Sequence, residues 1–293
     1  MKFIRDLLDK MEPLFDDGGK LERFYPLFEA TDTILFSTDE RTKSGPHIRD
    51  SIDIKRVMIS VVVALIPCYI FGAYNIGFQR SLTFGEETSV FQNFQIGTIT
   101  ILPILIATFV SGAFWEILFA ILRRHPISEG FLVTCALIPL TLPPSIPIWQ
   151  VVIATSFGIV IGKEIFGGVG MNIFNPALIA RAFVYFAYPT AISGDKVWAI
   201  GPDGYSGATA LSIPAAAVNA DSVNLLNNVT QFDYSWWNMF IGFIPGSVGE
   251  TSKILILLGA CFLIITKIAS WRTMLASVVG LFSTAFLYRR LGY

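Results

Sequence analysis

The segment 203–212 combines the features that a phosphate group needs from a protein backbone. Its two glycines allow a sharp turn that presents amide N–H groups outward. Ser206, Thr209 and Ser212 place three hydroxyls in the same short stretch. Amides freed by glycine beside small hydroxylated side chains form a cradle for phosphate. A loop with an Asp-Gly turn and a Ser/Thr helix cap explains the same residues, so the spacing leaves both interpretations open.

Glu116 is an ionisable residue inside a long apolar run. A carboxylate is costly to place inside a membrane, and such residues usually mark an ion or substrate pathway. The alternative is that Glu116 lies high enough to reach the membrane interface, or the side chains of Arg123 and Arg124.

Three further polar side chains lie at the starts of predicted helices. Thr134 follows Glu129-Gly130-Phe131 at the start of one apolar run, and Asn172 and Asn175 precede another. Exposed amides at a helix start make a site for a polar ligand. Helix capping explains the two asparagines as well, and the residues alone favour it.

The cysteines, the histidines and the net charge argue against several classes of site. Cys68, Cys135 and Cys261 lie far apart in apolar runs without metal-site spacing, so we expect them to be small core residues. His47 and His125 lie in charged segments, which argues against a haem held by two histidines across the membrane. A formal net charge of −1 gives no sign of nucleic-acid binding.

These residues must be positioned by helices in a membrane, because 53 % of the 293 residues are hydrophobic and 15 % are charged. We predict an all-α integral membrane protein, a multi-span helical bundle with broken or re-entrant helices. The spans are expected at about 57–74, 98–121, 131–144, 148–162, 176–192, 252–267 and 273–288, with a polar loop at 76–96 and a half-helix at 236–244 that is too short to cross.

The chain divides into a segment 1–55 and a transmembrane domain 56–293 with about seven spans and half-helices. Apolar residues at helical spacing predict an amphipathic helix at the start of the first segment, and there is no pattern of a cleavable signal peptide. Ten of the 21 Lys and Arg residues precede residue 57, which predicts a cytoplasmic N-terminus. The loop 193–235, which carries Thr209, is then on the outer face.

Two predicted interruptions, at Pro143-Pro144 and Pro245-Gly246, suggest an internal site. Unwound backbone at membrane depth persists only where protein buries it or where it lines a cavity. Transporters built from repeated halves use such breaks.

Ser206-Gly207-Ala208-Thr209 resembles the flavinylation motif of a family of membrane proteins, the B-type subunits of Na⁺-translocating NADH:quinone oxidoreductases and their Rnf equivalents. The resemblance extends through Gly18-Gly19-Lys20, Arg49–Arg56 and Ala269–Arg272, and family members continue for further spans beyond the point that matches the end of this sequence. It implies that the Thr209 hydroxyl is esterified to the phosphate of FMN. A separate Mg²⁺-dependent flavin transferase makes this bond from FAD, and Asp203 belongs to the same FMN segment.

The resemblance also implies roles for residues in or near the membrane. Thr134, Asn172 and Asn175 border a non-covalent riboflavin. Quinone-side positions are Gly112 and Ala113, where the family often has a Gly-Gly pair, with Phe131 and Glu129. Cation-handling positions are Glu116 and Glu29.

The function implied by the resemblance is electron transfer coupled to Na⁺ export across a bacterial inner membrane. Electrons pass from NADH through partner subunits of the A, C, D, E and F types to FMN, then to riboflavin, then to ubiquinone or menaquinone. Three alternatives remain: an Rnf-type subunit that exchanges electrons between ferredoxin and NAD, a solute channel or transporter, and a structural membrane subunit. The second is considered because the broken-helix bundle also resembles urea-transporter architecture.

Overall fold

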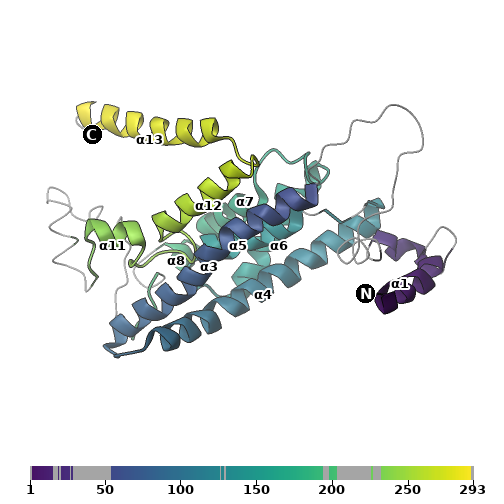
Figure 1. Cartoon of the computed structure of the whole chain (residues 1–293), viewed down its shortest axis with the longest axis horizontal. Helices are drawn as coiled ribbons and strands as arrows, with labels where there is room; N and C mark the ends of the chain where they lie inside the picture. Colours follow the sequence, from purple (N-terminus) through teal and green to yellow (C-terminus); the bar gives the residue numbers. More distant parts are fainter. Residues whose placement is uncertain are drawn as a thin grey trace.

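Every regular element in the described part of the chain is a helix (Figure 1). The structure is a computed structural model, and it describes residues 2–15, 19, 21–26, 28, 54–125, 127–128, 130–193, 198–202, 226 and 232–291. The longer helices are α1 (Lys2–Phe15), α3 (Ile54–Phe84), α4 (Val90–Arg123), α5 (Gly130–Thr141), α6 (Ile148–Gly162), α7 (Pro176–Ala187), α12 (Lys253–Ile265) and α13 (Trp271–Leu291). Short turns of helix are η1 (Glu22–Phe24), η2 (Glu164–Phe166), α8 (Pro189–Ile192) and α11 (Trp236–Ile241). The all-α prediction is confirmed.

Three of the described helices are long and apolar enough to cross a membrane: α3, α4 and the unit 148–166 formed by α6 and η2. The apolar helices α5, α7 and α12 have 12, 12 and 13 residues, and a helix of that length covers about 18–20 Å. They lie in the spans predicted at about 131–144, 176–192 and 252–267, and each is shorter than the roughly 20 residues that a helix needs to cross a bilayer. The count of about seven spans stays a prediction.

The predicted polar loop at 76–96 is wrong, because α3 continues to Phe84 and α4 begins at Val90. Asn93 is 3 % exposed, and its side-chain oxygen accepts hydrogen bonds from Ser81 and Thr88, so this polar group lies inside the hairpin. A capping box between Ser89 and Gln92 starts α4. The Ser-x-x-Gln spacing was a helix-start signal in the sequence.

The α3–α4 hairpin depends on glycines where the two backbones approach. A Cβ added at Gly97 would overlap the carbonyl oxygen of Ala73, and one added at Gly77 would overlap that of Asn93. Because both obstacles are backbone atoms, no side-chain movement relieves the clash. Small residues allow such close contact between membrane helices.

We therefore expect Gly97→Ala to destabilise the protein by about 1–3 kcal/mol or more, because the methyl group overpacks the hairpin. Gly280→Ala is the matched control, since nothing lies within 4 Å of a Cβ added there in α13. Alanine favours a helix over glycine by about 1 kcal/mol, so the control should be neutral or stabilising. Thermal unfolding in detergent measures both, and equal shifts would contradict the close-packing account.

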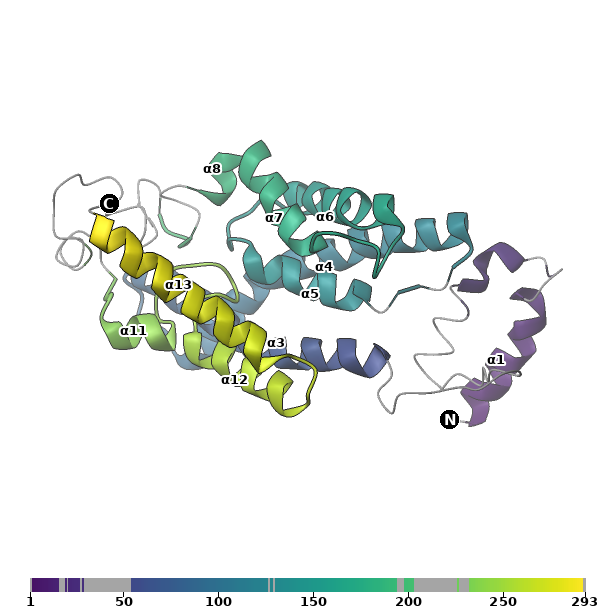
Figure 2. The same ribbon diagram turned by 90° about the horizontal axis from the view of Figure 1, so that it is seen from above.

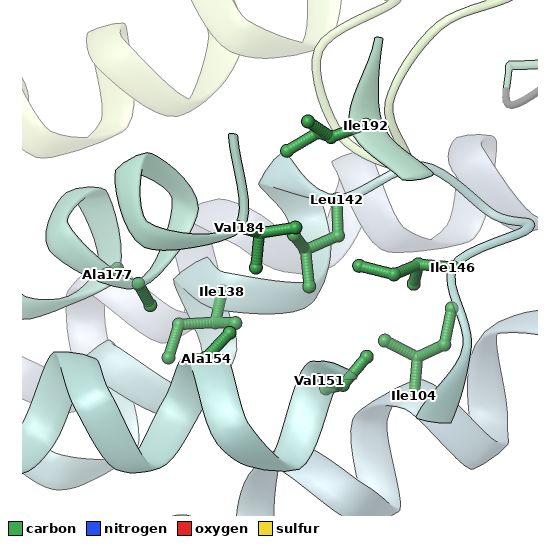
Figure 3. Close-up of a cluster of buried hydrophobic side chains, with 10 residues drawn as sticks. Ile104, Ile138, Leu142, Ile146, Val151, Ala154, Ala177, Val184 and Ile192 are labelled. Carbon is green, nitrogen blue, oxygen red and sulfur yellow. The ribbon is translucent and has the colours of Figure 1, made fainter. Parts of the chain in front are cut away.

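The largest buried cluster joins α4, α5, α6, α7 and α8 (Figure 3). Ile104 of α4, Ile138 of α5 and Val151 of α6 are each at most 1 % exposed. Leu142 and Ile146 extend this core into the α5–α6 connection. The break in the helix is thus anchored by its own apolar side chains.

The two predicted breaks lie against each other. The Val248 amide donates to the Leu142 carbonyl at 3.4 Å, and the Gly249 amide donates to the Leu140 carbonyl at 3.0 Å. The Asn75 side chain of α3 donates to the Ile244 carbonyl at 3.0 Å. Backbone groups freed by the interruptions are therefore satisfied inside the protein, as membrane burial requires.

The described ends of segment 193–235 are attached at one end of the bundle. The Thr83 hydroxyl, near the end of α3, donates to the Ile200 carbonyl at 2.7 Å. Ala199, Phe232 and Tyr234 form a small buried cluster beside α11. In Figure 2 these elements lie opposite the end that carries α1 and the C-terminal end of α4. Thr209 itself lies outside the described residues.

Candidate functional site

A chain of charged side chains lies at the C-terminal ends of α4 and α6. The Glu116 carboxylate contacts the Lys163 ammonium directly through Oε2. Lys163 Nζ lies 3.1 Å from Glu164 Oε1, and Glu164 Oε2 lies 3.3 Å from Arg123 Nη1. Glu116, Lys163 and Glu164 are only 2 %, 2 % and 1 % exposed. The charges alternate in sign along this series of contacts, from Glu116 through Lys163 and Glu164 to Arg123.

Local backbone structure fixes Lys163 and Glu164, the two residues in the middle of this series of charges. Lys163 ends α6, where a positive charge interacts favourably with the helix dipole, and its carbonyl accepts hydrogen bonds from the Phe166 and Gly168 amides. Gly167 and Gly168 have φ of +114° and +101°, which favours glycine, so the chain turns directly after η2. Arg123 Nη2 donates to the Glu164 carbonyl at 2.6 Å.

Glu116 has a partner other than Arg123 and Arg124, the side chains that one of the two sequence interpretations proposed for it. Arg123 binds Glu164, and the partner of Glu116 is Lys163, the residue directly after the span predicted at 148–162. The Ser128 amide also donates to Glu116 Oε1 at 3.4 Å. Removing charges from water costs several kcal/mol per ion, so only this compensation makes the burial tolerable.

Gly112 and Phe131, two of the predicted quinone-side residues, are brought together. Gly112 lies one helical turn before Glu116 on the same face of α4. A Cβ at Gly112 would lie 2.5 Å from Cys135 Sγ, 3.0 Å from the Phe131 ring and 3.1 Å from Ile159 Cδ1. The neighbouring Ala113 is half-buried.

We expect Gly112→Ala to destabilise the protein by about 1–3 kcal/mol, because its methyl group meets the Cys135 sulfur. Adding Cys135→Ala removes the nearest obstacle and should recover part of the loss. A double-mutant cycle on thermal unfolding, with Cys135→Ala alone as the control, should give a coupling of about 0.5–3 kcal/mol. Additive effects would mean that the two residues do not share this contact.

The residues predicted to border riboflavin lie on neighbouring elements. A Cβ at Gly130 would lie 2.9 Å from Val169, which places the start of α5 beside the glycine-rich turn. The Thr134 hydroxyl donates to the Gly130 carbonyl at 3.0 Å. Asn172 accepts from the Gly170 amide and donates to the Phe174 carbonyl.

Asn175 caps α7, because its side-chain oxygen accepts from the Ala177 amide at 2.9 Å. The capping role that the sequence favoured is confirmed for Asn175, whereas Asn172 bridges the preceding turn. A flavin role for these residues stays a prediction. Arg181 Nη1, in α7, lies 3.6 Å from Glu250 Oε2.

Several predicted site residues lie outside the described residues: Asp203, Ser206, Gly207, Ala208, Thr209, Glu129 and Glu29. Within the described ranges, no group of three or more His, Cys, Asp or Glu residues gathers as a metal site. Cys68 and Cys135 are buried as expected. The expectation was wrong for Cys261, which is exposed on the surface of α12.

Comparison with known proteins gives a consistent result. Residues 41–292 match the NQR2, RnfD, RnfE family. The chain is 50 % identical over 310 residues to the B-type subunit of the Na⁺-translocating NADH-quinone reductase of Chromohalobacter salexigens, covering 99 % of this chain and 73 % of that protein. Proteins of the same name from Azotobacter vinelandii and Pseudomonas paraeruginosa are 44 % and 41 % identical, each alignment covering 99 % of this chain and 75 % of the relative.

Proposed function

The chain belongs to the NQR2, RnfD, RnfE family, and we propose on this basis that it is the membrane subunit of a Na⁺-pumping NADH:quinone oxidoreductase. The names of the similar proteins favour this branch over a ferredoxin:NAD oxidoreductase. Within the complex, the subunit passes electrons to a quinone and takes part in Na⁺ export. The proposed location is a bacterial inner membrane, with the N-terminus in the cytoplasm.

The observation that carries the proposal is the buried chain of charges around Glu116. Ionisable groups inside an apolar bundle are retained for ion pathways, since a purely structural contact is cheaper to build from apolar side chains. Gly112 lies one turn before Glu116 on α4, and a Cβ added at Gly112 would lie 3.0 Å from the Phe131 ring, so the proposed quinone side and the proposed cation-handling residue share one region. Glu29 and Glu129 are proposed to belong to the same side of the protein.

Two flavins are proposed as carriers, FMN esterified to Thr209 and a non-covalent riboflavin near Thr134, Asn172 and Asn175. The polar edge of the isoalloxazine would accept hydrogen bonds from the asparagine amides, while the flavin itself supplies the redox chemistry. The attached ends of segment 193–235 support an FMN site at the end of the bundle opposite Glu116. The length of α4 between Val90, at that end of the bundle, and Glu116 is roughly 40 Å.

Partners of the A, C, D, E and F types and a flavin transferase are part of the proposal, because the named relatives are subunits of a complex. The test uses the whole complex in sealed vesicles with a protonophore present. NADH and a quinone should drive Na⁺ uptake into inverted vesicles, and omitting either should stop it. Na⁺ flux without NADH would indicate a channel, and electron transfer only with ferredoxin would indicate the Rnf branch.

A further inference from the structure

We propose that the Lys163 ammonium is a tethered cation that occupies the Glu116 carboxylate whenever Na⁺ is absent, so that Lys163 sets the affinity of the complex for Na⁺. This inference rests on the proposed cation-handling role of Glu116. The group that competes with Na⁺ for the Glu116 carboxylate then belongs to a residue 47 positions further along the chain, at the end of a different helix.

The geometry gives Lys163 a second carboxylate to hold. Its Nζ already lies 3.1 Å from Glu164 Oε1 while it contacts Glu116 Oε2. When it moves away from Glu116, the ammonium therefore stays paired with Glu164, and the Glu116 carboxylate is left for an arriving Na⁺. Arg123 holds Glu164 from the other side, through both the carboxylate and the backbone carbonyl, so Glu164 stays in place during the exchange.

The charge balance explains why Lys163 competes with Na⁺. Glu116, Glu164, Lys163 and Arg123 sum to zero when all four are ionised. A Na⁺ ion that reaches Glu116 must replace the contact with the ammonium, and the affinity measured for Na⁺ is reduced by the strength of that contact. Without the ammonium the cluster carries one excess negative charge in a site with little access to water, which attracts a cation strongly.

The test measures NADH:quinone reductase activity of the whole complex against Na⁺ concentration, with ionic strength held constant by choline. Lys163→Met should lower the half-saturating Na⁺ concentration by roughly ten-fold or more. Lys163→Arg keeps the positive charge and should remain near the wild type. Glu86→Gln, a substitution at an exposed position between α3 and α4, should leave the half-saturating Na⁺ concentration unchanged.

Thermal unfolding of the same complexes with and without Na⁺ gives a readout that does not depend on turnover. The stabilisation at low Na⁺ concentration should be larger for Lys163→Met than for the wild type. If this variant does not assemble, Glu116→Gln combined with Lys163→Met restores neutrality. That double variant should assemble and lose the response to low Na⁺ concentrations.

An unchanged half-saturating Na⁺ concentration in an assembled Lys163→Met complex, beside a Na⁺-stimulated wild type, would overturn the inference and leave the proposed function intact. A double variant that keeps the wild-type response would overturn it too. A wild-type complex without any Na⁺ response would instead remove the proposed function, and the inference with it.

Discussion

Thr209→Val should abolish covalent flavin in the purified subunit completely. Valine has nearly the shape of threonine but lacks the hydroxyl that would form the ester with the FMN phosphate, so the transferase has no nucleophile at this position. The measurement is flavin fluorescence of the denatured subunit on a gel, after co-expression with an active flavin transferase. Fluorescence that survives denaturation in the wild type and disappears in the variant would establish the attachment site.

The matched control is Ser212→Ala, which removes another hydroxyl from the same segment and should keep the fluorescence. Fluorescence that persists in Thr209→Val would place the attachment elsewhere. A wild-type subunit without flavin fluorescence, when the transferase is shown to modify another target, would contradict the flavoprotein proposal and favour the transporter alternative.

Helices were predictable where a local signal defined their ends. The span expected at 148–162 is the observed α6 (Ile148–Gly162), and the Asn-Pro pair at 175–176 gave both a cap and a first helical residue. The α3–α4 hairpin was misjudged because its polar residues read as a loop. Asn75, Gln79 and Asn93 are instead buried. Asn93 accepts from Ser81 across the hairpin, and Asn75 donates to the Ile244 carbonyl, so these positions depend on tertiary contacts.

The candidate site was only half predictable for the same reason. The cost of burying Glu116 identified it from the sequence alone, but its partner was not apparent. Lys163 and Glu164 end an apolar helix, where charged residues usually mark the membrane interface. Both residues contact α4, Lys163 through Glu116 and Glu164 through Arg123, and that packing cannot be derived from local pattern. Glu250, the partner of Arg181, was missed in the same way.

Glu116→Gln should raise the half-saturating Na⁺ concentration of the complex by roughly ten-fold or more, because it removes the charge that a cation would pair with. Glutamine keeps the size of the side chain and an oxygen that can accept from the Ser128 amide. The change also leaves Lys163 with only Glu164, so we expect a loss of stability of about 3–5 kcal/mol, typical of breaking a buried pair.

Stability and Na⁺ handling can be separated with two further variants. Glu164→Gln removes an equally buried charge from the same cluster but leaves the Glu116 carboxylate in place. Glu116→Asp keeps the charge, and should retain more of the Na⁺ response than Glu116→Gln at the same flavin content. If Glu164→Gln and Glu116→Gln shift the Na⁺ dependence equally, the cluster acts only as a structural unit. A shift confined to Glu116 identifies this carboxylate as the group that meets Na⁺, and the opposite shifts expected for Glu116→Gln and Lys163→Met then follow from a single contact.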